Sequence, residues 1–319
     1  MKKLLAILLA AILCVGLMAG CGQTTIIVNM GGEDEAEETP VATETPENTP
    51  EAAASEAPVV DDTPLPEGQL KTGLAIVSVV SSSSKAASAD ADGLAQADTT
   101  FVSVLVDGDG VIKDCLIDCV QTKIAVSATG EILTAADTAF DSKIVLDDAY
   151  DMRKASPIGA EWDEQANFLA DYVTGKTLDE VKGIAIDDGG KPTDADITTG
   201  CTMNIAEILT AVENAVANAK VLGAGVDDTL HMNCNAIVSS SSKAASADGD
   251  GNAQADVTVG AYTLDASGVI TSCYLDCVQA KIAVTAAGEI ASEVGTSYDS
   301  KLVLDDAYDM RKASPIGAE

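Results

Sequence analysis

A direct repeat constrains the fold of this chain more than any other feature of its sequence. The segment Val80–Asp90 recurs as Val238–Asp248, an offset of 158 residues, and Leu146–Glu161 reappears unchanged at the same offset as Leu304–Glu319. Near-identical segments adopt the same local structure, so we expect two copies of one unit in tandem. The second copy stops where the first continues into helices. We therefore expect the sequence to be a C-terminally incomplete fragment of a longer protein.

The patterns within one copy predict an α+β unit. Alternating apolar residues and a turn at Asp107–Gly110 are typical of an antiparallel β-meander, and apolar residues at helical spacing follow it. Asn204 and Glu207 have the spacing of a capping pair for the last helix. The expected fold class is an antiparallel β-meander with C-terminal helices on one sheet face, tandemly repeated with a truncated second copy. The expected strands are 74–80, 99–106, 111–120 and 123–127, and the expected helices are 162–173, 178–181 and 204–219.

The first residues have the layout of an export signal. Lys2 and Lys3 precede an apolar run that ends in Ala19, Gly20 and Cys21, and the run is short for a membrane span. This end resembles the lipobox of bacterial lipoproteins, in which the cysteine is acylated and becomes the new N-terminus. The resemblance implies lipidation of Cys21 and a protein anchored on the extracytoplasmic face of the cell membrane, at the surface of a Gram-positive bacterium.

An acidic spacer follows the signal. Residues 33–67 contain twelve acidic residues, no lysine or arginine, and six of the nine prolines, a composition that favours an extended, disordered linker. We therefore expect four regions. They are the signal peptide with its lipobox cysteine (1–21), the acidic linker (22–69), a complete module (70–222) and a second copy that lacks the C-terminal helices (223–319).

Charge and composition exclude several classes of function. The formal net charge of −33 repels polyanions, so we expect no nucleic-acid partner. His231 is the single histidine, which largely excludes catalytic triads and multi-histidine metal sites. No convincing pair of nucleophile and base points to a hydrolase.

The cysteines of the two copies are expected to be small buried thiols rather than a disulfide framework. Cys115 and Cys119 point to the same face of a strand but lie about 13 Å apart at roughly 3.3 Å per residue, too far for a disulfide or a shared metal. Cys273 and Cys277 repeat this arrangement, whereas Cys201 and Cys234 have no cysteine counterparts. Cross-strand pairing remains possible in an exported protein.

Two weaker candidate sites are polar clusters. The loop from Asp248 to Asp256 has oxygen ligands at some places of an EF-hand loop, but Ala253 replaces the required glycine, so a flexible polar loop is the expected interpretation and no metal site is predicted. Recurring cations could form an anion site, with Trp162 stacking on a planar ring, although surface ion pairs and a core tryptophan are the default. These cations are Lys123, Lys143, Arg153 and Lys154, and in the second copy Lys281, Lys301, Arg311 and Lys312.

The strongest candidate is the segment Asp196–Thr202, which stands just before the clearest helix. It resembles the Asp-x-x-Ser/Thr-Gly-Ala-Thr signature of the FMN-binding domain family, whose members include exported lipoproteins that carry flavin. The resemblance covers roughly residues 97–220. It implies that a flavinyltransferase attaches FMN to Thr202 through a phosphoester bond, with Asp196, Thr199 and Gly200 as the other signature positions. Cys201 stands where alanine is usual, and Asn204 where a second hydroxyl residue is common.

Physical considerations agree with this resemblance. A phosphate on Thr202 would face the free N–H groups of the following helix, and Gly200 would leave room for it. An ordinary capped helix requires the same residues. The leading hypothesis is a membrane-tethered electron carrier with covalent FMN, served by a flavinyltransferase and an unidentified membrane redox partner, rather than an enzyme with its own substrate turnover. The alternative is a non-redox surface lipoprotein that uses a degenerate version of this fold as a ligand-binding or spacer module.

Overall fold

The computed structural model describes residues 64–315. The predicted signal peptide, Cys21 and most of the acidic linker lie outside the described residues. Among the described residues, no helix is long and apolar enough to cross a membrane.

The strands are β1 (Lys71–Val80), β2 (Gly93–Val106), β3 (Ile112–Val126), β4 (Ala139–Phe140), β5 (Thr229–Val238), β6 (Gly251–Leu264), β7 (Ile270–Val284) and β8 (Ser297–Tyr298). The α-helices are α1 (Lys143–Leu146), α2 (Trp162–Val173), α3 (Leu178–Lys182), α4 (Ala195–Thr198), α5 (Ala206–Ala217) and α6 (Lys301–Leu304). Short 3-10 helices, η1 (Asp147–Tyr150), η2 (Asp305–Tyr308) and η3 (Met310–Lys312), accompany them.

The protein has an α+β fold with two antiparallel four-stranded sheets. The strand order is β3-β2-β1-β8 in one sheet and β4-β5-β6-β7 in the other. Strands β5 to β8 and helix α6 have the bounds of β1 to β4 and α1 shifted by the repeat offset. The strands form because β-branched and other apolar residues dominate them. In β1, Leu74 and Ile76 lie on one face and Ala75 and Val77 on the other, so both faces are apolar.

The two copies exchange their shortest strands. β8 belongs to the second copy but pairs with β1, and β4 belongs to the first copy but pairs with β5. The exchange is reciprocal in its hydrogen bonds. The N–H of Val80 donates to the carbonyl of Thr296 at 2.9 Å, and the N–H of Val238 donates to the carbonyl of Thr138 at 2.9 Å. Each copy therefore completes the sheet of the other.

A second reciprocal contact joins the hairpin tips. Gly130 and Gly288 both have positive φ and approach the backbone of the other copy so closely that a Cβ atom would not fit. Ala87 donates its N–H to the carbonyl of Gly288 at 2.8 Å, and Ala245 donates to that of Gly130 at 2.9 Å. The copies thus form one compact unit rather than two modules that move independently on a linker.

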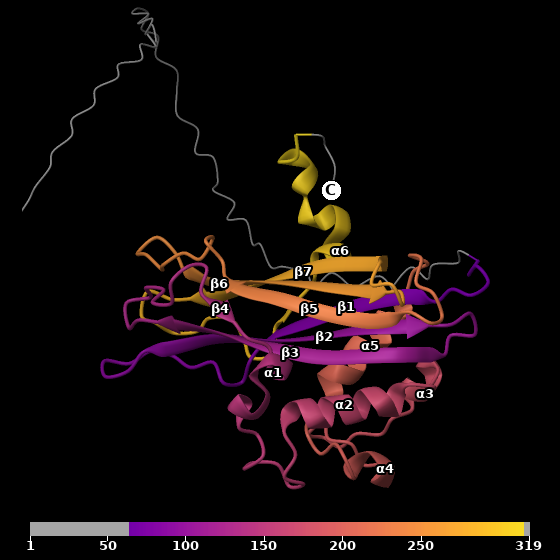
Figure 1. Ribbon diagram of the computed structural model, residues 1–319. Coiled ribbons are helices and arrows are strands. Elements are labelled where there is room, and N and C mark those ends of the chain that lie inside the picture. The colour runs from indigo at the N-terminus through magenta and orange to yellow at the C-terminus, as the bar shows by residue number, and fades with distance from the viewer. Residues whose placement is uncertain (1–63, 316–319) are drawn as a thin grey trace, which may run out of the picture. The chain divides into compact units, whose positions relative to one another are not determined.

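The first sheet is covered on both faces, whereas the sequence predicted cover from helices alone. Figure 1 shows α2 and α5 on one side of β1–β3 and the second sheet on the other. Trp162, Leu169, Ile208 and Val212 of the helices pack on residues such as Val104 and Ile117. On the opposite face, residues of both copies share two clusters, in which Ile124 joins Ile282 and Phe101 joins Val259. The pattern of apolar residues along a strand shows whether one or both faces of the sheet are apolar. It does not show whether a helix or a second sheet covers each face.

Within residues 64–315, no helix covers the outer face of the second sheet as α2 and α5 cover the first, and the residues on that face differ. Gly73, Ala75 and Val104 of the first copy are replaced by His231, Asn233 and Tyr262 in the second. His231 stacks on Tyr262 with a centroid separation of 5.2 Å, and the Asn233 amide donates to the Tyr262 hydroxyl at 3.2 Å. A Cβ atom at Gly73 would collide with the carbonyl of Ala215 in α5. A helix placed on the second sheet as α5 is on the first would therefore meet the His231 side chain.

Most predicted elements are present with longer strands. Helix α2 has the predicted bounds, while β2 begins six residues earlier than expected, at Gly93 rather than Thr99. β3 runs without interruption from Ile112 to Val126 where two segments were expected. Among the extra residues, Ala95 and Ala97 are buried in a cluster shared with the second copy. Gln96 is buried with its amide bonded to Ser81 and Asp98.

Candidate functional site

Thr202 lies on a short connection that is anchored on both sides. The preceding helix α4 ends at Thr198, and α5 begins at Ala206. Cys201 and Met203 are buried, while the Thr202 side chain between them is partly exposed. Thr202 donates its backbone N–H to Gln165 Oε1 at 2.9 Å, and its hydroxyl lies 3.4 Å from the same oxygen as a hydrogen-bond donor. The hydroxyl is thus held in a defined place at the surface.

Gln165 is the residue that positions Thr202, and we did not predict it from the sequence. Its side chain is fully buried on the inner face of α2. The Gln165 Nε2 group donates to the Ser156 hydroxyl at 3.3 Å and to the Ala160 carbonyl at 3.2 Å. These two bonds turn Oε1 toward Thr202. The available signal was a polar residue on the apolar stripe of a helix, which requires a buried hydrogen-bond partner.

The other signature residues make local contacts. Asp196 and Thr199 are both exposed or partly exposed around α4, and the Thr199 hydroxyl donates to the Asp196 carbonyl at 2.8 Å. The ring of Phe168 fills the space beside Gly200, so a Cβ atom at residue 200 would collide with it. The expectation that Gly200 leaves room for a phosphate is therefore wrong. Its missing side chain makes room for Phe168.

The start of α5 also differs from the prediction. The first helical residue is Ala206, and its N–H already donates to Asn204 Oδ1 at 2.9 Å. The predicted Asn204–Glu207 capping pair does not form. Thr202 stands four residues before the helix and therefore does not face a free helix N-terminus, contrary to the sequence-based account. Ile205, which follows Asn204, is buried in the core, and the first helical turn begins only after it.

Trp162 lies in the wall of a cavity of about 300 Å³ that does not include Thr202 among its lining residues. Trp162 is 5% exposed, and the Lys143 ammonium lies 4.8 Å from its ring centroid and 4.8 Å from that of Tyr150. The indole is therefore a cation-covered core residue rather than a free platform for a planar ring. The lining of this cavity includes Ser81, Asp98, Lys143 and Glu207 of the first copy, and Val294 and Gly295 of the second.

The charges of this cavity perturb one another. Burial lowers the pKa of Lys143, but the nearby Cys119, Tyr150 and Asp98 outweigh this effect, so its pKa lies above the ordinary value. Partial desolvation raises the pKa of Glu207, and the negative charge of Asp98 raises it further. Desolvation also raises the pKa of Cys119 to about 11, which keeps this buried thiol protonated at neutral pH.

The remaining cations of the predicted anion site are engaged elsewhere. Arg153 bonds to Asp148 at 3.0 Å and to Glu164 at 2.7 Å, and Lys154 pairs with Asp151 at 2.7 Å. Lys123 is exposed on β3. In the second copy, Arg311 pairs with Asp306 and Lys312 with Asp309, both at 2.6 Å, while Lys301 lies over Tyr308. The default interpretation as surface ion pairs therefore applies to Arg153, Lys154, Arg311 and Lys312. Lys281 is exposed on β7, as Lys123 is on β3.

The loop considered for calcium does not gather its carboxylates. Asp248 lies in a turn in which its N–H donates to the Ser246 hydroxyl, and Asp256 on β6 accepts from the amides of Gln254 and Gln279. Across residues 64–315, no group of three or more His, Cys, Asp or Glu residues could hold a metal ion.

The six described cysteines are all free. Cys115, Cys119 and Cys201 are buried as predicted, Cys234 and Cys277 are partly buried, and Cys273 is exposed, so the prediction is wrong for Cys273. The same strand position is buried in the first copy under the helices and open in the second. Sequence identity between the copies could not reveal this difference.

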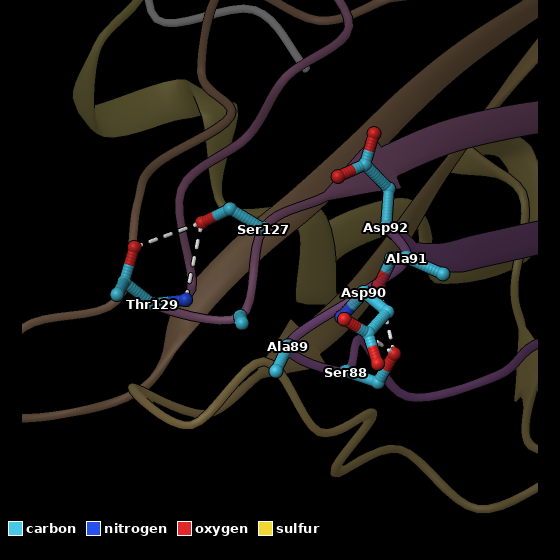
Figure 2. A pocket seen from close by; sticks show the side chains of 8 residues that line it. Ser88, Ala89, Asp90, Ala91, Asp92, Ser127 and Thr129 are labelled. Carbon is cyan, nitrogen blue, oxygen red and sulfur yellow. Dashed lines mark hydrogen bonds between the residues drawn. The ribbon is translucent and has the colours of Figure 1, made fainter.

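A shallow hollow lies between two loops of the first copy (Figure 2). Ser88–Asp92 forms one side and Ser127–Thr129 the other, and the Ser127 and Thr129 hydroxyls bond to each other at 2.9 Å. The side chains are small or acidic and include no cation or aromatic ring. The hollow offers little chemistry beyond that of solvent-exposed loops.

Comparison with protein-family models, with curated proteins and with solved structures finds no match.

Proposed function

We propose that this protein is a membrane-tethered, extracytoplasmic flavin carrier, with FMN attached covalently at Thr202. The observation that carries the proposal is the placement of the Thr202 hydroxyl. It reaches the surface while its neighbours Cys201 and Met203, and its partner Gln165, are buried. A modifying enzyme needs access to the hydroxyl, and a carrier needs a fixed attachment point. Thr202 meets both requirements.

In this proposal the flavin supplies one- and two-electron transfer, and the protein holds it. Gln165 orients the attachment residue, and the peptide on either side of it is fixed in the core. Trp162 has no part in stacking on the ring, because Lys143 covers it. The partners are a flavinyltransferase, the membrane through a lipid on Cys21, and a membrane redox partner. The protein moves electrons and has no substrate turnover of its own.

The test uses the full chain, because its predicted export signal delivers it to the compartment of the transferase and the second copy covers the inner face of the first sheet. The protein is co-expressed with an active exported flavinyltransferase, and a denaturing gel is inspected for flavin fluorescence. We expect a fluorescent band that is lost in Thr202→Ala and retained in Thr198→Ala, which removes a neighbouring, partly exposed hydroxyl. A dark band beside a labelled control substrate, or fluorescence that persists in Thr202→Ala, would contradict the proposal.

A non-redox surface lipoprotein is the second candidate, and the interlocked copies favour it. Reciprocal strand exchange between the copies produces one compact unit in which each sheet is completed by the other copy. Such a unit could serve as a spacer or as a ligand-binding module beyond the acidic linker. A dark band in the experiment above, together with a folded protein, is the result that this candidate predicts.

A further inference from the structure

The cavity beside Lys143 is built by both copies of the repeat. The first copy contributes the end of β1, the middle of β2 and β3, helix α1 and the starts of α2 and α5. The second copy contributes Val294 and Gly295 just before β8. Gly295 is held there because its N–H donates to the carbonyl of Val80 at 2.9 Å. The cavity is thus complete only when the second copy is in place.

The walls of the cavity carry opposite charges that do not neutralise each other. Lys143 contributes an ammonium, and Asp98 and Glu207 contribute carboxylates, but no ion pair joins Lys143 to either acid within the described chain. All three side chains line the same cavity. Lys143 and Asp98 are only partly exposed, whereas Glu207 is exposed to solvent. A partly desolvated ammonium such as that of Lys143 is stabilised when a ligand or water pairs with it.

The roles of the two acids differ. Asp98 already accepts hydrogen bonds from the Ser81 hydroxyl at 2.6 Å and from Gln96 Nε2 at 2.7 Å, so its position is fixed. Glu207 makes no hydrogen bond or ion pair with the described residues, and it projects from the first turn of α5. Glu207 is therefore the carboxylate that remains available to a ligand, with Asp98 adding negative potential behind it.

We propose that this cavity binds a small zwitterion that carries both an ammonium and a carboxylate group, such as a free amino acid. The ligand carboxylate pairs with Lys143, and the ligand ammonium pairs with Glu207 next to Asp98. A simple anion leaves both acids unpaired, and a simple cation leaves Lys143 unpaired. The volume of about 300 Å³ lies at the lower end of ligand pockets, which fits a ligand of amino-acid size. The inference does not depend on flavin at Thr202.

The test measures binding to residues 22–319 by calorimetry and by ligand-detected NMR. The probes are L-alanine and 4-aminobutanoate, which differ in charge separation, and their one-charge analogues propanoate, ethylamine, butanoate and butylamine. We expect at least one zwitterion to bind about tenfold or more tightly than both of its analogues, as a charge-assisted hydrogen bond at each end implies. No binding by either zwitterion, or equal binding by a one-charge analogue, would overturn the proposal.

Three variants locate the site. Lys143→Gln and Glu207→Gln should each weaken binding of the zwitterion about tenfold. Lys301→Gln, at the repeat position equivalent to Lys143, should leave binding unchanged. Glu207 reaches solvent at the start of α5, so its variant keeps the test valid if Lys143→Gln perturbs the packing of Trp162. Unchanged affinity in a folded Glu207→Gln protein, judged by circular dichroism, would refute the assignment.

Discussion

Gly73 of β1 lies against the backbone carbonyl of Ala215 in α5 with no space for a Cβ atom. The helix reaches the first sheet only because residue 73 has no side chain. At the equivalent place in the second copy stands His231, on a sheet face that no α5-type helix covers within residues 64–315. The covered face of the first sheet therefore has glycine at the position where the open face of the second has histidine.

Replacing Gly73 by alanine should destabilise the protein. The added methyl group must push α5 away from the sheet, and overpacking of this kind costs about 1–3 kcal/mol. Denaturant unfolding followed by Trp162 fluorescence measures the loss. His231→Ala is the matched control, because it shortens a side chain at the same strand position without a helix above it, and it should change stability far less. Equal losses in the two variants would contradict the packing account.

The two copies should unfold in one transition, because each sheet contains a strand of the other copy. Ile282 of the second copy is 2% exposed and packs between the sheets, and Ile282→Ala should cost about 2–5 kcal/mol. The single tryptophan is in the first copy, so a shift in its midpoint reports coupling. Leu275→Ala, at an exposed position of the same strand, should stay within about 0.5 kcal/mol of the parent. A Trp162 midpoint unmoved by Ile282→Ala would show that the copies unfold separately.

Cys273 should react first with a maleimide in the folded protein. It is exposed, whereas Cys115, Cys119 and Cys201 are buried, and burial raises the pKa of Cys201 to about 11. Mass spectrometry of residues 22–319 at slightly alkaline pH should show one fast adduct on Cys273, slower reaction of Cys234 and Cys277, and three protected thiols. The fast adduct should vanish in Cys273→Ser. Rapid labelling of Cys201 in folded protein would show that the helices do not cover it.

Stability should increase as the pH is lowered from neutral toward the ordinary range of aspartate. Burial raises the pKa of Asp118 and of its repeat mate Asp276. A carboxyl whose pKa is higher in the folded state than in the unfolded state contributes stability below the unfolded pKa. That contribution is lost as the pH rises through the folded pKa. The dense negative charge of the chain acts in the same direction. Unfolding midpoints measured from neutral to mildly acidic pH check the sign.

Asp118→Asn should flatten this dependence, because the neutral amide can keep an acceptor for the N–H groups of Cys119 and Ile144 while avoiding the buried charge. Asp265→Asn is the control of opposite sign. Hydrogen bonds from Ser267 and Val269 lower the pKa of Asp265, so its contribution is lost as the pH falls through that pKa. A pH profile that is the same in Asp118→Asn as in the parent would contradict the assignment.

The residue types of the sequence indicated which segment would form the candidate site. They did not indicate how the side chains of that segment would be placed. The segment Asp196–Thr202 was predicted to precede a helix, and it does precede α5, with Thr202 partly exposed. The reciprocal Asn204–Glu207 capping pair and the space at Gly200 were predicted wrongly, and Trp162 is the core tryptophan of the default interpretation rather than a stacking platform. Gly200 and Trp162 depend on contacts with Phe168 and Lys143, distant residues that local spacing does not contain.

The sequence by itself determined the elements of the fold. Turn residues and the spacing of apolar residues are local, so the strand predicted at 74–80, which extends over 71–80, and the helix 162–173 follow from neighbouring residues. Tertiary structure decided which surfaces meet. Nearly identical copies could lie apart as two modules or exchange strands, and the same pattern of alternation serves both arrangements. The choice depends on non-local contacts, such as those of Gly130 and Gly288 across the two copies and of Gly73 under α5.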